Sequence, residues 1–468
     1  MKLIYNVQDK PKFGQLIVFA FQQLLAIMAA TIVVPLITNG NSAANVAQGI
    51  GVASDMSTAA ALLGAGIGTI VYLLFTKFRS PVFLGSSFAF LGSMAAAFAG
   101  ATSAQLGYVG LILGAVFAGL VYVIIAIIVK LVGVKWINKL MPAVVIGPTV
   151  AIIGLSLAGS AISDFQKAPA GGDPRIAVVC GLVTLAVTML CSVFGKKTLK
   201  MIPFIIGILA GYVVAVVFTI IGNVAGIDAL KVISYDAFKA LFADGVKFSS
   251  FIALPDFTFV KALGGVKEIT GAYVANIAVA YAPVAFVVFA EHIADHKNIS
   301  SIIEKDLLED PGLSRTLLGD GVGSMAGAFF GGCPNSTYGE SVGCVAISRN
   351  ASVVTILTTA ILAILISFVS PFVAFLSSIP NCVMGGVCIA LYGFIAVSGL
   401  KMIQQVDLGE NKNLFVVSVI LITGIGGLAL SFGKVTITSI ACALILGILA
   451  NVMLAKGKFE DEDEDEDK

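Results

Sequence analysis

The sequence has little charge for its length. Only 12% of its 468 residues are Asp, Glu, Lys or Arg, and 58% are hydrophobic, whereas soluble proteins carry about 25% charged residues. Too few polar side chains remain to cover a surface that faces water, so a soluble enzyme or binding module is excluded. The apolar residues instead fall in runs of about 18 to 25, the length of a helix that crosses a bilayer. We therefore predict a polytopic membrane protein surrounded by lipid.

Histidine and paired cysteine are also scarce. The chain has 2 histidines and 7 cysteines. An odd number of cysteines without a CxxC pair indicates neither a disulfide framework nor a zinc site, so we expect small apolar packing residues. No nucleophile–base constellation and no cofactor loop appears in the sequence. We therefore expect a protein that is not an enzyme and that has no cofactor.

About fourteen membrane segments are predicted, seven in each half of the chain. Lysine and arginine gather in the loops after even-numbered segments, including those that hold Lys135, Lys139, Lys197 and Lys200, and basic loops stay in the cytoplasm. Both termini are therefore expected to be cytoplasmic, and an odd number of segments per half inverts one half against the other. The segments are expected near Gln15–Ile37, Ser57–Phe75, Val82–Phe98, Leu106–Val129, Met141–Ser160, Ile176–Val193, Ile202–Ile221, Thr270–Asp295, Leu313–Gly331, Thr337–Ser348, Val353–Phe368, Ile379–Leu400, Leu414–Ser431 and Val435–Leu454.

The acidic residues are concentrated at one end. Glu460 to Asp467 is an unbroken run of acids, so the net charge of +1 hides a basic body. Such a run is typical of a solvated, disordered end, and we expect residues 459–468 to form an acidic cytoplasmic tail.

Two of the expected segments are poor membrane helices. Ser80–Phe90 reads SPVFLGSSFAF and Gly331–Gly343 reads GGCPNSTYGESVG, with Pro, Gly and Ser where a spanning helix favours Leu. They are the third segment of each half. Irregular backbone at membrane depth is tolerated only inside protein or around a cavity, and paired interruptions indicate a substrate site. A half-helix that starts after each break would aim free N–H groups at a ligand.

Acidic residues near these breaks are the candidate site. Glu291 and Glu340 are the acids best embedded in apolar sequence, and intramembrane carboxylates are usually functional. Asp295 shares a helix face with Glu291, and His292 and His296 form a second i, i+4 pair. Asp295 and His296 are expected either to cap the segment at the cytoplasmic interface or to join the site. Two carboxylates with backbone donors suit a neutral, planar ligand, and Phe88, Tyr338 and Tyr392 could cover its flat faces.

Other functions stay open on these residues alone. A divalent-metal carrier could use Glu291, His292, Asp295 and His296, since imidazole and carboxylate both bind metals, but no second cluster completes the shell. An anion exchanger would meet repulsion from two carboxylates and would call for a basic residue in the tenth segment. A membrane sensor that transports nothing is the remaining class.

Several motifs resemble the nucleobase/ascorbate transporter family, and within it the bacterial uracil permeases. The resemblance covers nearly the whole chain, and the motif of the tenth segment is the most specific. The motifs are QQLLAIMAATIVVPL, LGSSFAF, AEHIADH, KDLLEDPGLSRTLLGDG, FFGGCPNSTYGESVG, VMGGV and LYG. Three positions depart from the family pattern: Gln22-Gln23 stands where Gln-His is usual, Asp295 where some members have His, and Ser341 where Asn is usual.

The resemblance implies an all-α fold of fourteen segments in two inverted repeats, with short antiparallel strands in segments 3 and 10. It implies a core domain (residues 1–140 and 270–370) and a gate domain (residues 141–269 and 371–458). Substrate-binding positions carried over by motif are Phe88, Glu291, Gly339, Glu340 and Tyr392. Proton-coupling positions are Glu291, Glu340, Asp295 and His296.

Family members typically move a nucleobase together with a proton, and many form dimers. Because purine-transporting relatives tend to carry an amide at the Glu340 position, the resemblance favours uracil, with xanthine or another nucleobase as the alternative. Burial disfavours the charged form of a carboxyl group, so Glu291 or Glu340 could take up the coupling proton. We expect uracil:proton symport across a bacterial plasma membrane by a homodimer, with no nucleic-acid partner.

Overall fold

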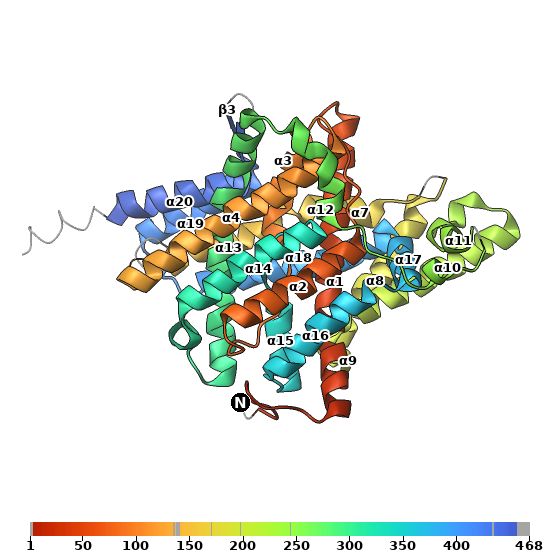
Figure 1. The fold of residues 1–468 in the computed structure, drawn as a ribbon. Coiled ribbons are helices and arrows are strands. Elements are labelled where there is room, and N and C mark those ends of the chain that lie inside the picture. The colour runs from red at the N-terminus through yellow and green to blue at the C-terminus, as the bar shows by residue number, and fades with distance from the viewer. Residues whose placement is uncertain are drawn as a thin grey trace, which may run out of the picture.

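The structure is a computed structural model that describes residues 3–133, 136, 141–169, 171–196, 198–243, 245–432 and 435–455. The acidic tail 459–468 lies outside the described residues, as do Lys135, Lys139 and Lys197. The chain is mainly helical. Figure 1 shows α19 and α20 at one end of the molecule, α10 and α11 at the opposite end, and α2, α13 and α14 between them.

The larger elements follow the expected segments in order. They are α1 (Phe13–Ala47), α2 (Thr58–Phe75), β1 (Leu84–Ser86), α3 (Leu91–Ala99), α4 (Ala104–Val132), α6 (Ala143–Ser156), α7 (Ala158–Gln166), α8 (Pro174–Phe194), α9 (Thr198–Met201), α10 (Pro203–Ala225), α11 (Asp236–Phe242), α12 (Thr258–Ala262), α13 (Gly271–Ile303), α14 (Leu313–Gly331), β2 (Asn335–Thr337), α15 (Gly339–Ser348), α16 (Val353–Ile366), α17 (Ser370–Ser378), α18 (Asn381–Ile403), α19 (Asn411–Ile425), β3 (Leu430–Phe432), β4 (Val435–Ile437) and α20 (Ser439–Ala455).

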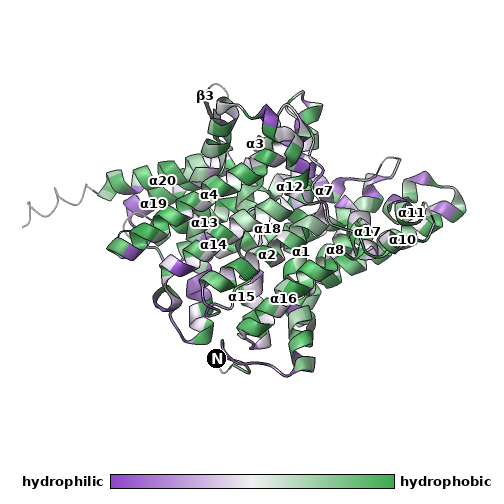
Figure 2. Cartoon of the chain, in the orientation of Figure 1, coloured by the Kyte–Doolittle hydropathy of each residue, from purple (hydrophilic) through white to green (hydrophobic). Residues whose placement is uncertain are grey.

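Eight of the described helices are long and apolar enough to cross a membrane, and four shorter apolar helices accompany them. Figure 2 shows that hydrophobic residues dominate the helical body, while hydrophilic ones gather in the connections. The protein is therefore a multi-pass membrane protein. The number of fourteen segments and the inverted relation of the two halves stay predictions.

The two broken segments meet in the middle of the fold. β1 pairs antiparallel with β2, with Leu84 opposite Thr337, Gly85 opposite Ser336 and Ser86 opposite Asn335. A short 3-10 turn, Phe88–Phe90, leads from β1 into α3, and α15 starts directly after β2. The antiparallel strands that the resemblance implies are therefore present. All six strand residues are buried, and pairing satisfies backbone groups that no water reaches.

Several predicted boundaries are wrong. α1 continues past Ile37 to Ala47, and α13 continues past Asp295 to Ile303. Polar side chains allow the longer α1, because Asn39 donates to the Met56 carbonyl over 3.0 Å and Ser42 lies 2.8 Å from Ser54 between their hydroxyl oxygens. The end of segment 13 and the start of segment 14 are strands, because β3 and β4 form an antiparallel hairpin there. The hydropathy of these residues does not distinguish this hairpin from the ends of two helices.

Helices α2 and α14 pack closely through glycine. A Cβ atom on Gly68 would lie 2.7 Å from the Gly323 carbonyl oxygen, and one on Gly331 would lie 2.4 Å from that of Ala60. Small residues allow such close backbone approach, which is how helices associate inside membranes. This helix pair also supports β2, since Asn335 donates to the Gly64 carbonyl over 3.1 Å.

Candidate functional site

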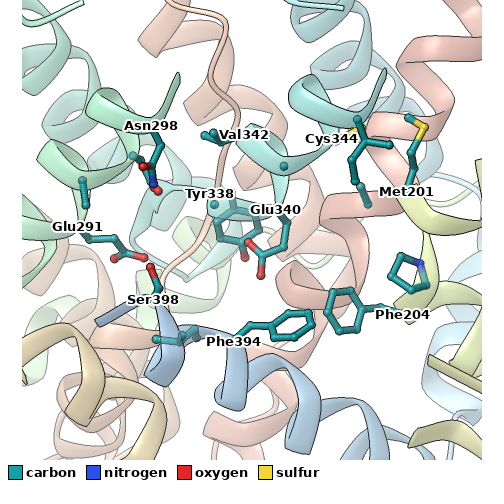
Figure 3. A pocket seen from close by; sticks show the side chains of 18 of the residues that line it. Met201, Phe204, Glu291, Asn298, Tyr338, Glu340, Val342, Cys344, Phe394 and Ser398 are labelled. Carbon is teal, nitrogen blue, oxygen red and sulfur yellow. The ribbon is translucent and has the colours of Figure 1, made fainter. Parts of the chain in front are cut away.

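A cavity of about 370 Å³ opens where the broken segments meet the helices around them. Its walls come from α13, α15, α18 and the α9–α10 region, with Phe88 and Ser336 contributed by the broken segments. Figure 3 shows side chains from these elements pointing into one space. Its volume lies in the range of small-molecule sites, roughly 300–1,000 Å³.

Three carboxylates line this cavity. Glu291 and Asp295 come from α13, one turn apart, and Glu340 comes from the first turn of α15. Glu291 and Glu340 are half-buried, and Figure 3 shows the Glu291 carboxylate close to Ser398 and that of Glu340 beside the Tyr338 ring. The first-turn N–H groups of α15 lack intrahelical acceptors. Carboxylate acceptors and backbone donors therefore share one small space.

Gly339 is the first residue of α15 and also lines the cavity. A Cβ atom there would lie 3.7 Å from Asp295 Oδ1, so α13 and α15 approach each other at this point. Asp295 accepts a hydrogen bond from Thr337 Oγ1 over 2.7 Å. This bond joins α13 to β2 and leaves one oxygen of Asp295 for other contacts.

The prediction of an interfacial cap at Asp295 and His296 is wrong. Asp295 is 7% exposed and His296 is fully buried, because α13 extends two further turns and the neighbouring helices cover both side chains. His296 lies 2.7 Å from the Tyr72 hydroxyl through Nε2, and it does not line the cavity. Of these two candidates, the structure therefore brings only Asp295 to the acidic site.

The four residues of the metal-carrier hypothesis do not converge. His292 does not line the cavity; its Nδ1 lies 2.7 Å from Asp320 Oδ2 and its Nε2 lies 3.0 Å from Thr316 Oγ1. Among the described residues, no group of three or more His, Cys, Asp or Glu side chains is arranged to hold a metal ion. The structure gives this hypothesis no support.

Two of the three aromatic candidates line the cavity, and the third packs behind one of them. Phe88 and Tyr338 line it. Tyr392 is buried outside the lining, and its ring packs edge-on against that of Phe88 with centroids 5.7 Å apart. Tyr392 would therefore affect a ligand only indirectly, by holding the Phe88 ring in place.

Four further residues of the lining carry no signal in the sequence. Asn298 from α13, Ser398 and Phe394 from α18, and Phe204 from α10 all face the cavity, and the Phe204 and Phe394 rings pack 5.7 Å apart. Their segments read as ordinary spans, so only the tertiary arrangement identifies them. Lys200, predicted to be one of the cytoplasmic loop charges, also lines the cavity. One lysine against three carboxylates disfavours an anionic ligand.

Hydrogen bonds of several side chains hold the paired strands β1 and β2 in place. The Tyr338 hydroxyl donates to the Ser86 carbonyl over 2.8 Å. Gln23 Nε2 on α1 donates to Ser341 Oγ over 2.6 Å, and the Phe83 N–H donates to the same oxygen over 3.2 Å. Gln23 and Ser341, two of the departures from the family pattern, therefore contact each other. Correlated substitutions at these two positions among related sequences would be the signal for this contact.

Known proteins resemble this chain over nearly its full length. The permease family matches residues 14–432. The uracil permease of Bacillus caldolyticus is 37% identical over 457 residues, covering 97% of this chain and 95% of that protein. The uracil permease of Escherichia coli strain K12 is 33% identical over 447 residues, covering 95% of this chain and 92% of that protein.

Two solved structures share the fold. The transmembrane domain of the cyanobacterium bicarbonate transporter BicA aligns with a TM-score of 0.59 at 15% identity, covering 96% of this chain and all of that one. SLC26A9 aligns with a TM-score of 0.61 at 12% identity, covering 95% of this chain and 66% of that one. At such low identity the likeness concerns the fold alone.

Proposed function

The chain belongs to this permease family, so it is a membrane transporter and not an enzyme, and from that premise we propose that it imports uracil in symport with protons. The proposal extends to a secondary active transporter in a bacterial plasma membrane with both termini in the cytoplasm. It is supported by relatives that are named uracil permeases and by the chemistry of the cavity. No resident cofactor is needed, because the proton is the coupling ion.

The observation that carries the proposal is the acidic pair Glu291 and Glu340 in one small cavity beside the start of α15. Uracil is flat and uncharged, with two N–H donors and two carbonyl acceptors on its edge. In the proposed complex, Glu291 and Glu340 accept from N–H groups, and the Gly339 and Glu340 amides donate to a carbonyl. Phe88, backed by Tyr392, covers a face of the ring.

The proton is proposed to bind at Glu291 or Glu340, which share the ligand's space. Asp295 lies in the same cavity and is the third candidate for the proton site. His296 does not line the cavity, so a role in proton coupling would be indirect. Uracil carries no charge, so one proton moves one charge per cycle. A membrane potential of 100 mV then supplies about 2.3 kcal/mol, enough for about 50-fold accumulation.

Alternating access is proposed to occur between the core domain (residues 1–140 and 270–370) and the gate domain (residues 141–269 and 371–458). The cavity lies between elements of both, with α13 and α15 on one side and α9, α10 and α18 on the other. A site between two such units is exposed to either side when one rocks against the other. Assembly as a homodimer is part of the proposal.

The decisive experiment is uptake of radiolabelled uracil in a bacterial strain that lacks its own uracil permease. We expect the intact chain to restore uptake, and Glu291→Gln and Glu340→Gln each to reduce kcat/KM at least 30-fold, because each loses a charged acceptor worth about 2 kcal/mol or more. The matched control is Glu309→Gln, an exposed glutamate outside the cavity, which should transport like the intact protein. Wild-type transport by both cavity variants would show that the site is elsewhere.

Competition by unlabelled thymine, xanthine, urate and ascorbate in the same assay tests the cargo. Uracil should compete best. If xanthine competes better than uracil, the family assignment stands and the proposed substrate is wrong.

A further inference from the structure

We propose that His292 and His296, held by Asp320 and Tyr72, are positioning residues that set the rotation of α13 and so aim Glu291 and Asp295 into the cavity. The inference rests on the proposed function, because it concerns how the binding carboxylates are oriented. It assigns a role to the two buried histidines, neither of which lines the cavity.

The order of residues along α13 is the first argument. Each cavity carboxylate is followed directly by a histidine: Glu291 by His292, and Asp295 by His296. Successive side chains of an α-helix are about 100° apart, and residues four apart share a face. The acids therefore share the face that lines the cavity, and the histidines share the adjacent face, where both are fully buried.

The first clamp joins α13 to α14. His292 Nδ1 lies 2.7 Å from Asp320 Oδ2, and its Nε2 lies 3.0 Å from Thr316 Oγ1. Asp320 is 1% exposed, and its other oxygen has no hydrogen-bond partner among the described residues. The bond to His292 is thus a main source of hydrogen bonding for this buried carboxyl group, and rotation of α13 would break it at high cost.

The second clamp joins α13 to α2. His296 Nδ1 donates to the His292 carbonyl over 2.8 Å, so its proton is on that nitrogen in the neutral ring. Its Nε2 is then an acceptor, 2.7 Å from the Tyr72 hydroxyl, and Tyr72 also lies 2.7 Å from Ser80 Oγ. The two imidazole rings stack with centroids 4.0 Å apart. Both clamps therefore belong to one continuous polar network.

The partners of the clamps are themselves fixed. Tyr72 lies on α2 and Asp320 on α14, the two helices that pack backbone to backbone through Gly68 and Gly323. A polar network inside an apolar bundle orients its members more strictly than apolar contacts do, because an unpaired buried group is costly. Two anchors one turn apart, on a rigid pair of helices, define the angle of α13 about its axis.

The test uses a matched pair of tyrosines in the purified full-length protein. Tyr72→Phe removes the hydroxyl that bonds His296. Tyr122→Phe removes a hydroxyl that is equally buried and has no hydrogen-bond partner among the described residues, although its ring faces His292 at 6.4 Å between centroids. We expect the Kd for uracil to rise about tenfold for Tyr72→Phe and less than twofold for Tyr122→Phe. Asp320→Leu tests the α14 clamp, because it removes the hydrogen-bonding group that contacts His292, and it should resemble Tyr72→Phe, with all Tm values measured alongside.

A second readout needs no uracil. A hydrophobic carbodiimide labels accessible carboxyl groups, and mass spectrometry locates the label at Glu291. We expect Tyr72→Phe and Asp320→Leu to change the labelling rate of Glu291 at least threefold, with Tyr122→Phe unchanged.

The two readouts separate the two proposals. Failure of the wild-type protein to bind uracil removes the proposed function, and the labelling rates still decide whether the histidine network orients α13. Wild-type labelling of Glu291 in both Tyr72→Phe and Asp320→Leu overturns the inference, whatever their Kd or Tm. A lower Tm without a change in labelling assigns the network to stability only.

Discussion

At the scale of residues, Gln23 and Ser341 both depart from the family pattern, and they form a hydrogen bond with each other. Gln23 donates to Ser341 Oγ, which also accepts from the Phe83 N–H beside β1. All three groups are buried. One hydroxyl oxygen thus joins α1, the entry to β1 and the first turn of α15, one residue after Glu340. The position of this carboxylate depends on an oxygen that never touches the ligand in the proposed complex.

Removing that oxygen should therefore weaken both stability and transport. Ser341→Ala leaves the buried Phe83 N–H without its acceptor, and Gln23 Nε2 keeps only the Ser341 carbonyl at 3.4 Å. An unpaired buried donor costs about 1–3 kcal/mol, so we expect a lower Tm in detergent and a KM for uracil raised about five- to tenfold. Ser324→Ala is the control, because the Ser324 hydroxyl is buried on α14 without a hydrogen-bond partner among the described residues. Equal behaviour of the two variants in thermal unfolding and uptake would contradict this account.

At the scale of elements, the paired strands β1 and β2 set the place of the site. Each is three residues long, too short to be stable alone, and each is stabilised by side-chain bonds to its surroundings. Thr69 Oγ1 accepts from the Leu84 N–H over 2.9 Å, and Tyr338 reaches across to Ser86. The helices that follow can then begin inside the protein, and the first residues of α15, Gly339 and Glu340, line the cavity.

A substitution at Gly85 tests whether the pairing of β1 with β2 positions the site. A Cβ atom on this residue would overlap the Tyr338 ring, so Gly85→Ala must displace β1 or Tyr338, and overpacking of this kind costs about 1–3 kcal/mol. We expect folded protein with a lower Tm and at least tenfold weaker uracil binding. Gly40→Ala on α1, where the new Cβ meets no atom within 4 Å, should bind uracil normally. Normal uracil binding by Gly85→Ala would mean that the pairing of β1 with β2 does not position the site.

A second element-scale prediction concerns the cap of α4. Glu268 accepts from Thr102 Oγ1 over 2.7 Å and from Ser103 Oγ over 2.8 Å, and these bonds lower the pKa of its carboxyl group. A pKa that is lower in the folded state contributes stability above the unfolded pKa of about 4.3, and that stability is lost as the pH falls through the folded value. The Tm should therefore drop on acidification from pH 6 to about pH 3.5 by less in Glu268→Gln than in wild type. Identical Tm profiles would contradict this linkage.

At the scale of the whole molecule, the cavity draws its walls from both halves of the chain. Phe88 and Lys200 come from the first half, and Glu291, Glu340 and Ser398 from the second. A ligand held there contacts both halves, so relative movement of the proposed core and gate domains could pass it across the membrane.

Proton coupling is tested on the whole transporter. In vesicles with an inward proton gradient, labelled uracil should accumulate above its external concentration, and a protonophore should abolish accumulation while equilibration continues. A sodium gradient in place of the proton gradient is the control and should drive no accumulation. Concentrative uptake that survives the protonophore would refute the coupling.

Much of this protein follows from the order of its residues alone. Hydropathy runs determine that the chain lies in a membrane, because no other solvent accommodates so little polar surface. The interrupted segments and the acids Glu291 and Glu340 indicate where a ligand would bind, since broken backbone and carboxyl groups are costly in lipid unless they meet a cavity.

Only the tertiary structure decided which side chains share the cavity and which are buried behind it. Asp295 and His296 are adjacent in sequence, yet one lines the cavity with the acids and the other bonds Tyr72 on α2. Phe394 and Ser398 carry no sequence signal, and Gln23 meets Ser341 across more than 300 residues of chain. The physical reason is that helical periodicity gives the relative angle of neighbouring side chains, whereas the packing of each helix against its neighbours decides which of those side chains faces the cavity.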